Sequence, residues 1–122
     1  MKIRIAVAST NTPADLDHLA ALVDGLEERR FDTLWLSDTP MTPAVEPLLA
    51  LAIASSRTTR LKLGTNVVVP GRNPLHLAKE LAHLDRLHCG VIVGRQTDEA
   101  YLALLLGVLQ ALESIAVDQI VI

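Results

Sequence analysis

The sequence has few aromatic residues, a single cysteine and no excess of positive charge. Its 122 residues include one Phe, one Trp and one Tyr, so Leu, Val, Ile and Ala must build the core. The one cysteine, Cys89, excludes a disulfide within the chain and is typical of a protein from a reducing compartment. The formal net charge of −3, without a basic cluster, argues against nucleic acid or an anionic membrane surface as partner.

Long hydrophobic segments are also missing. The longest uncharged apolar stretch covers residues 100–112, which is shorter than the roughly 20 residues of a membrane-spanning helix. The apolar run in the N-terminal MKIRIAVAST is too short for a signal peptide. No stretch has the composition of a linker or of a low-complexity segment. The sequence therefore predicts a single domain over residues 1–122, located in the cytoplasm.

Short β-branched runs alternate with helical patterns along the whole chain. Strands are expected at residues 3–8, 33–37, 61–69, 90–93 and 117–122. Helices are expected between them. Three of these helices begin where a proline stands at the first helical position, namely at Thr12-Pro13, Glu46-Pro47 and Asn73-Pro74, and a fourth helix is expected over residues 97–114.

This alternation predicts an α/β fold with a parallel sheet and right-handed crossovers. Two architectures fit about five strands and four helices. One is part of a (β/α)₈ or TIM barrel, whose complete form needs about 250 residues. The other is a five-stranded doubly wound sheet, which 122 residues would complete. Both bind ligands at the carboxyl-terminal ends of the strands, so the candidate segments are residues 9–11, 37–39, 66–73 and 94–96.

Three motifs follow one another along residues 1–90. They are FDTLWLSD at residues 31–38, TRLKLGT at 59–65 with PGRNP at 70–74, and a helical segment from Ala78 that ends in LDRL at 84–87. This set resembles the luciferase-like family of flavin- and deazaflavin-dependent oxidoreductases. The last segment, residues 116–122, is similar to a strand near the end of that family's barrel. The chain thus resembles a shortened member of the family whose middle part is missing.

The resemblance implies a bound flavin or deazaflavin ring, from FMN or coenzyme F420, at the end of the third strand. It implies that Asp38, Thr65, Asn66 and Val67 lie at this ring, with a cis peptide bond between Asn66 and Val67. Arg72, which stands between Pro70 and Pro74 in a rigid loop, is a candidate to bind an anionic cofactor tail or substrate.

The residues by themselves leave other interpretations open. Gly64 is also typical of a bend in a strand, and Asn66 of a side chain that caps a local backbone group. Asp38 is typical of an Asx turn at the start of a loop, and Arg72 of a solvated loop arginine. Thr39 departs from the family, because many members have histidine there and threonine cannot act as an acid–base group near neutral pH.

The implied function is an oxidoreductase or monooxygenase that transfers a hydride to or from the ring and acts on a small-molecule substrate. No catalytic residue is assigned. No metal site is expected, because His76 and His83 lie two helical turns apart, about 10 Å, and the histidines are expected to be ordinary surface residues of helices. The alternative is a non-catalytic remnant that acts as an α/β assembly module. Residues 100–112, apolar on every face of a helix, predict a homodimer contact in either case.

Overall fold

The computed structural model of the protein describes residues 3–9, 13–66, 72–88, 91–94, 107 and 120–121. The elements in chain order are β1 (Ala6–Ser9), α1 (Leu16–Glu28), β2 (Thr33–Ser37), α2 (Pro47–Ser55), β3 (Lys62–Asn66), α3 (Pro74–Leu87), β4 (Val91–Gly94) and β5 (Ile120–Val121). The helix expected at 97–114, and with it the expected dimer contact at 100–112, lies outside the described residues except for Gly107, which is helical.

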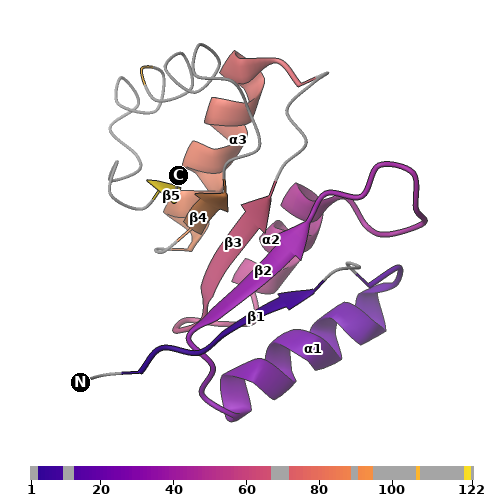
Figure 1. The fold of residues 1–122 in the computed structure, drawn as a ribbon, viewed down its shortest axis with the longest axis vertical. Coiled ribbons are helices and arrows are strands. Elements are labelled where there is room, and N and C mark those ends of the chain that lie inside the picture. Colours follow the sequence, from indigo (N-terminus) through magenta and orange to yellow (C-terminus); the bar gives the residue numbers. More distant parts are fainter. Residues whose placement is uncertain are drawn as a thin grey trace.

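The strands are parallel and lie side by side in the order of the sequence, β1-β2-β3-β4-β5 (Figure 1). A doubly wound sheet reverses its strand order at a switch point. The described strands show no such reversal, so the doubly wound alternative is wrong for this part of the chain. The prediction of a parallel α/β fold is confirmed. A full set of five strands and four helices stays a prediction, because the fourth helix lies outside the described residues.

One face of the sheet carries the hydrophobic core. Side chains alternate along β2, so Leu34 and Leu36 are buried while Thr33, Trp35 and Ser37 are half-buried. The two leucines join residues of all three helices in one cluster, so α1, α2 and α3 cover the same face. The other members of this cluster come from the helices, from β3 and from the residue before β3, and they are Leu19, Val23, Leu26, Leu48, Ala50, Leu51, Ala54, Leu61, Leu63, Leu77, Ala78, Leu81 and Leu84.

The opposite face of the sheet is not covered by α1, α2 or α3, and we call it the open face. The registers of β1 with β2 and of β2 with β3 place its residues in three neighbouring rows. The residues of the open face are Ala6, Ala8, Thr33, Trp35, Ser37, Lys62, Gly64 and Asn66. Within the described part of the chain, no helix covers this face.

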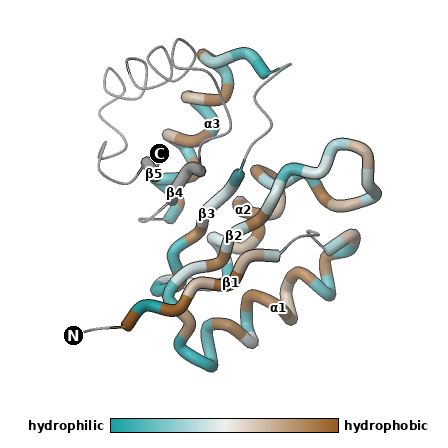
Figure 2. The backbone as a smooth tube through the Cα atoms, viewed as in Figure 1, coloured by the Kyte–Doolittle hydropathy of each residue, from teal (hydrophilic) through white to brown (hydrophobic). Residues whose placement is uncertain are grey.

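Helices α2 and α3 begin at Pro47 and Pro74, as their sequences predict. Helix α1 begins later than predicted, because Asp15 rather than Thr12 is its N-cap and accepts the backbone N–H of His18 at 2.9 Å. Figure 2 shows apolar and polar residues alternating along α1 and α3, as expected for helices that bury one stripe against a sheet. None of the helices in the described part of the chain has the length and apolarity that a bilayer crossing requires.

The N-cap of α1 contains a pH-dependent pair. The Asp15 Oδ2 atom lies 2.5 Å from His18 Nδ1, and this hydrogen bond, together with the carboxylate charge, raises the pKa of His18. The backbone N–H of His18, and then its ring, lower the pKa of Asp15. The stability from His18 is present below its ordinary pKa of 6.5 and is lost as the pH rises through the raised value. The stability from Asp15 is lost as the pH falls through its lowered value.

We therefore predict that Asp15→Asn returns the pKa of His18 toward its ordinary value, since asparagine keeps the N-cap oxygen but carries no charge. The pKa of His18 is measured by an NMR titration of the imidazole protons. Asp17→Asn is the control, because the charge of Asp17 is a smaller cause of the shift. An identical His18 titration in wild type and Asp15→Asn would contradict the pair.

Thr58 joins two elements at the amino-terminal ends of the strands. Its side chain is buried, and its hydroxyl donates to Glu27 Oε2 in α1 and accepts the backbone N–H of Leu61 at 3.0 Å. Next to it, the Arg60 guanidinium donates to the carbonyl oxygens of Phe31 at 2.9 Å and Glu27 at 3.1 Å. These hydrogen bonds connect the end of α1 with the start of β3 and fix the position of the helix relative to the strand.

Replacing Thr58 by valine should lower the free energy of unfolding by about 1–3 kcal/mol, because the buried N–H of Leu61 loses its acceptor. Urea unfolding measures this loss. The matched control is Thr59→Val, one residue away and exposed, which should stay within about 0.5 kcal/mol of wild type. Equal effects of the two substitutions would show that the buried hydroxyl has no special role.

The histidines divide into exposed and buried residues. His18, His76 and His83 are exposed, as predicted. The prediction is wrong for His88, which is buried and whose Nε2 atom lies 2.8 Å from the carbonyl oxygen of Leu61. His88 follows α3, so its ring links the end of this helix to the start of β3. Within the described residues, no three His, Cys, Asp or Glu side chains are grouped as metal ligands.

Candidate functional site

The candidate site lies on the open face, at the carboxyl-terminal ends of β2 and β3. In the register of these strands, Trp35 stands opposite Gly64 and Ser37 opposite Asn66. A Cβ atom added to Gly64 would lie 2.7 Å from ring atoms of Trp35, so the indole packs directly against the backbone of the glycine. The indole covers the buried Gly64 and so presents an apolar surface beside the Ser37 hydroxyl and the Asn66 amide.

Asp38 fixes the end of β2 beside this surface. Its backbone N–H donates to the carbonyl oxygen of Asn66 at 2.9 Å, which continues the pairing of β2 with β3 past the last strand residue. Its carboxylate accepts a hydrogen bond from Arg72 Nη2 at 2.9 Å, and the side chain is 9% exposed. Asp38 is therefore held by both backbone and side chain.

Arg72 lies between two carboxylates. Its Nη2 atom donates to Asp38 Oδ2 at 2.9 Å and to Glu46 Oε1 at 2.7 Å. Burial lowers the pKa of Arg72, but the hydrogen bonds and charges of Glu46 and Asp38 outweigh it and raise the pKa overall, so the guanidinium stays charged. The interpretation of Arg72 as a solvated loop arginine is therefore wrong.

Thr65 and Val67 do not join this group in the described structure. Thr65 lies on the helix-covered face, is fully buried, and donates its hydroxyl to the carbonyl oxygen of Leu36 at 3.0 Å. Val67, and with it the peptide bond predicted to be cis, lies outside the described residues. The structure thus brings Asp38, Asn66 and Arg72 together, and places the Thr65 side chain on the other side of the sheet.

Two further residues, Trp35 and Glu46, belong to the site and were not predicted as binding residues, whereas Ser37 lies in the predicted segment 37–39. Trp35 shares the open face with Ser37 and Asn66, and the alternation of TLWLS in β2 was the signal that could have identified it. Glu46 was recognised only as the start of a helix. Its contact with Arg72 spans 26 residues and left no local pattern in the sequence.

Thr39, at the position where many family members have histidine, is engaged within the loop between β2 and α2. The Thr42 hydroxyl lies 2.9 Å from both the carbonyl oxygen and the Oγ1 atom of Thr39. A cavity of about 150 Å³ lies beside this loop, between Asp38 and Pro47. It is smaller than the roughly 300 Å³ at which ligand pockets begin, so it is not the place for a tricyclic ring.

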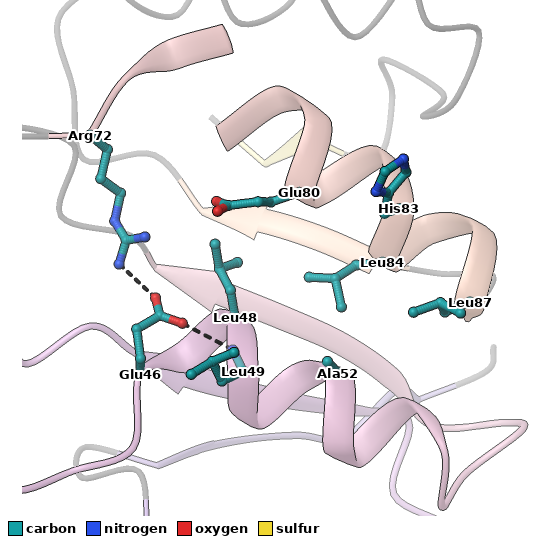
Figure 3. Close-up of a pocket in the computed structure, with 9 residues that line it drawn as sticks. All are labelled: Glu46, Leu48, Leu49, Ala52, Arg72, Glu80, His83, Leu84 and Leu87. Carbon is teal, nitrogen blue, oxygen red and sulfur yellow. Dashed lines mark hydrogen bonds and ion pairs between the residues drawn. The ribbon is translucent and has the colours of Figure 1, made fainter. Parts of the chain in front are cut away.

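A larger groove of about 460 Å³ lies between α2 and α3 (Figure 3). Leu48 and Leu84 form its buried floor, while Leu49 and Leu87 are exposed at its sides. The groove runs along the two helices and not along the open face. Arg72 and Glu46 line one end of it, so these two residues lie between the groove and the candidate site.

A family model described as luciferase-like monooxygenase matches residues 1–100. The chain belongs to the luciferase-like monooxygenase family. The match confirms the family membership that the three sequence motifs predicted. No curated protein matches the chain.

Solved structures of luciferase-like enzymes share the fold of this chain. The F420-dependent tetrahydromethanopterin reductase of Methanopyrus kandleri is 24% identical, with a TM-score of 0.62 over 84% of this chain and 30% of that one. The monooxygenase RslO1 of Streptomyces bottropensis is 26% identical, with a TM-score of 0.62 over 97% and 38%. The oxygenating constituent of 3,6-diketocamphane monooxygenase from Pseudomonas putida, solved with FMN, is 14% identical, with a TM-score of 0.71 over 93% and 39%.

These matches bear on the fold of the chain and on its cofactor. The α/β fold of the luciferase-like chain resembles that of TIM-barrel neighbours, although the chain spans only 30% to 39% of their length. One neighbour is F420-dependent and another was solved with FMN, which agrees with the two cofactors that the motifs imply.

Proposed function

We propose that this chain forms the ring-binding part of a luciferase-like oxidoreductase that uses FMN or F420 and acts on a small-molecule substrate by hydride transfer or monooxygenation. The observation that carries the proposal is the open face, where the Trp35 indole lies against Gly64 beside Ser37 and Asn66. Of the predicted cofactor-binding residues we propose Asp38, Asn66 and Val67 for the ring site. Arg72 holds the Asp38 carboxylate, and the Thr65 side chain faces the helices on the other side of the sheet.

The residues of the open face fit an aromatic heterocycle. The Trp35 indole, packed on Gly64, offers an apolar surface for a ring to stack on, and the Asn66 amide and Ser37 hydroxyl offer hydrogen bonds to the ring's nitrogen and oxygen atoms. A bound flavin or deazaflavin supplies the redox chemistry. Trp35 excludes water from the site, and Asn66 and Ser37 orient the ring. The cis bond at Asn66–Val67 is part of the proposal.

A fluorescence titration tests the proposed function. Trp35 is the only tryptophan, so its emission reports on the open face. We expect saturable quenching at micromolar concentrations by FMN or by F420. Asn66→Ala should weaken the binding severalfold, because one hydrogen bond is lost. Lys62→Ala, at the amino-terminal end of the same face of β3, is the matched control and should leave the affinity unchanged. Failure of both cofactors to bind at millimolar levels would overturn the proposal.

A second function, of a different class, is an α/β assembly module without cofactor. It is supported by Thr39, which stands where many family members have histidine and cannot act as an acid–base group near neutral pH. For either function we propose a homodimer through residues 100–112, located in the cytoplasm. Sedimentation velocity at micromolar concentration should show the dimer, and a monomer would contradict it. Cofactor binding in the fluorescence titration decides between the two functions.

A further inference from the structure

Arg72 connects segments that are far apart in the sequence. Its Nη2 atom reaches Asp38 at the end of β2 and Glu46 at the start of α2, across 34 and 26 residues. The Arg72 side chain is 25% exposed, Asp38 9% and Glu46 36%. The next residue, Asn73, is the N-cap of α3. One guanidinium therefore lies where β2, α2 and α3 come together.

Glu46 uses its two carboxylate oxygens for different partners. Oε2 accepts the backbone N–H of Leu49 at 2.9 Å and so caps α2, whereas Oε1 accepts the hydrogen bond of Arg72 at 2.7 Å (Figure 3). A shift of Arg72 thus changes the position of the carboxylate that caps the helix. A negative charge at this helix end is also favourable by itself, because it faces the positive end of the helix dipole.

Asp38 connects Arg72 with the candidate site. Its carboxylate binds Arg72, and its backbone N–H binds the carbonyl oxygen of Asn66 at 2.9 Å. The Asn66 side chain lies on the open face at the carboxyl-terminal end of β3. The chain of contacts from Arg72 through Asp38 to Asn66 contains only hydrogen bonds of 2.9 Å.

The charge around Arg72 does not suit an anionic ligand. Among the described residues, two carboxylates face the Arg72 guanidinium, which gives these three side chains a net charge of 1 − 2 = −1. A phosphate or carboxylate tail that approached Arg72 would meet Asp38 and Glu46 as like charges. We propose that Arg72 is a positioning residue, which orients the ring site through Asp38 and Asn66 and does not bind the anionic tail of the cofactor. This inference rests on the proposed function.

The first test compares FMN with riboflavin, which has the same ring but no phosphate. In Arg72→Leu, a positioning role should weaken the binding of both by the same factor, about tenfold, because charge-assisted hydrogen bonds are lost. Arg72→Lys should recover part of this loss, because it keeps the charge. Glu46→Gln should weaken both ligands in the same ratio. If Arg72→Leu weakens FMN alone, Arg72 binds the tail and the inference is overturned.

If F420 and not FMN binds to the wild type, the comparison is made between F420 and a deazaflavin that has the same ring but no anionic tail. The expected results do not change. Equal weakening of the two ligands supports positioning, and weakening of F420 alone overturns it.

The second test needs no cofactor. Amide hydrogen exchange should be about tenfold faster at Leu49 and Asp38 in Arg72→Leu, with partial recovery in Arg72→Lys. The amide of His18, which Asp15 caps in α1, is the control and should be unchanged. Unchanged exchange at Leu49 and Asp38 overturns the inference. Faster exchange in a protein that binds no ring overturns the proposed function, and with it the role of Arg72 at a ring site, although the contacts of Arg72 with Asp38 and Glu46 are then still supported.

Discussion

Replacing Leu51 by alanine should lower the free energy of unfolding by about 2–5 kcal/mol. Leu51 is fully buried in α2, the middle helix, and belongs to the cluster that joins all three helices to β2 and β3. Alanine removes the apolar contacts of the side chain and leaves a cavity that the surrounding helices fill only in part. A loss of this size is a large fraction of the stability of a small domain.

The matched control is Leu49→Ala, two residues earlier in the same helix. Leu49 is 63% exposed, so its truncation removes little buried surface and should change stability by no more than about 0.5 kcal/mol. Urea unfolding of both variants measures the difference. If they lose the same stability, α2 does not pack on the sheet in the way the structure shows.

The second large effect is expected at Gly64. A Cβ atom there would lie 2.7 Å from two ring atoms of Trp35, closer than carbon atoms can approach. Gly64→Ala must therefore displace the indole, and we expect a loss of about 1–3 kcal/mol in the free energy of unfolding. Because Trp35 is the only tryptophan, a shift of the emission maximum reports the displacement directly.

Gly25→Ala is the control for this substitution, because the sign of its effect is opposite. Gly25 lies inside α1, and an added Cβ meets only the tip of the Arg29 side chain at 2.9 Å, which moves at little cost. Alanine is the better helix former, so stability should rise by about 0.5–1 kcal/mol. A Gly64→Ala variant with wild-type stability and unchanged emission would show that Trp35 does not lie on Gly64.

The Gly64 substitution also bears on the proposed function. If a flavin or deazaflavin ring stacks on the surface formed by Trp35 and Gly64, Gly64→Ala should weaken its binding, whereas Gly25→Ala should not. The two variants together separate a general loss of stability from a change in the ring site.

Some features of this protein follow from the sequence by itself. Pro47 and Pro74 mark the beginnings of α2 and α3, because proline fits the first position of a helix and few others. The alternation in TLWLS identifies β2 as a strand with one buried face. The motifs around Asp38 and Arg72 identify the family and, through it, FMN or F420 as the candidate cofactor.

The tertiary structure decided the features that depend on distant residues. The strand order excludes the doubly wound sheet, although both architectures have the same sequence of elements. Arg72 pairs with Asp38 and Glu46, which are 34 and 26 positions away in the sequence. His88 is buried against Leu61, 27 positions away, and Trp35 of β2 packs on Gly64 of β3. Local patterns reflect the backbone preferences of neighbouring residues, whereas these contacts exist only once the strands and helices have packed together.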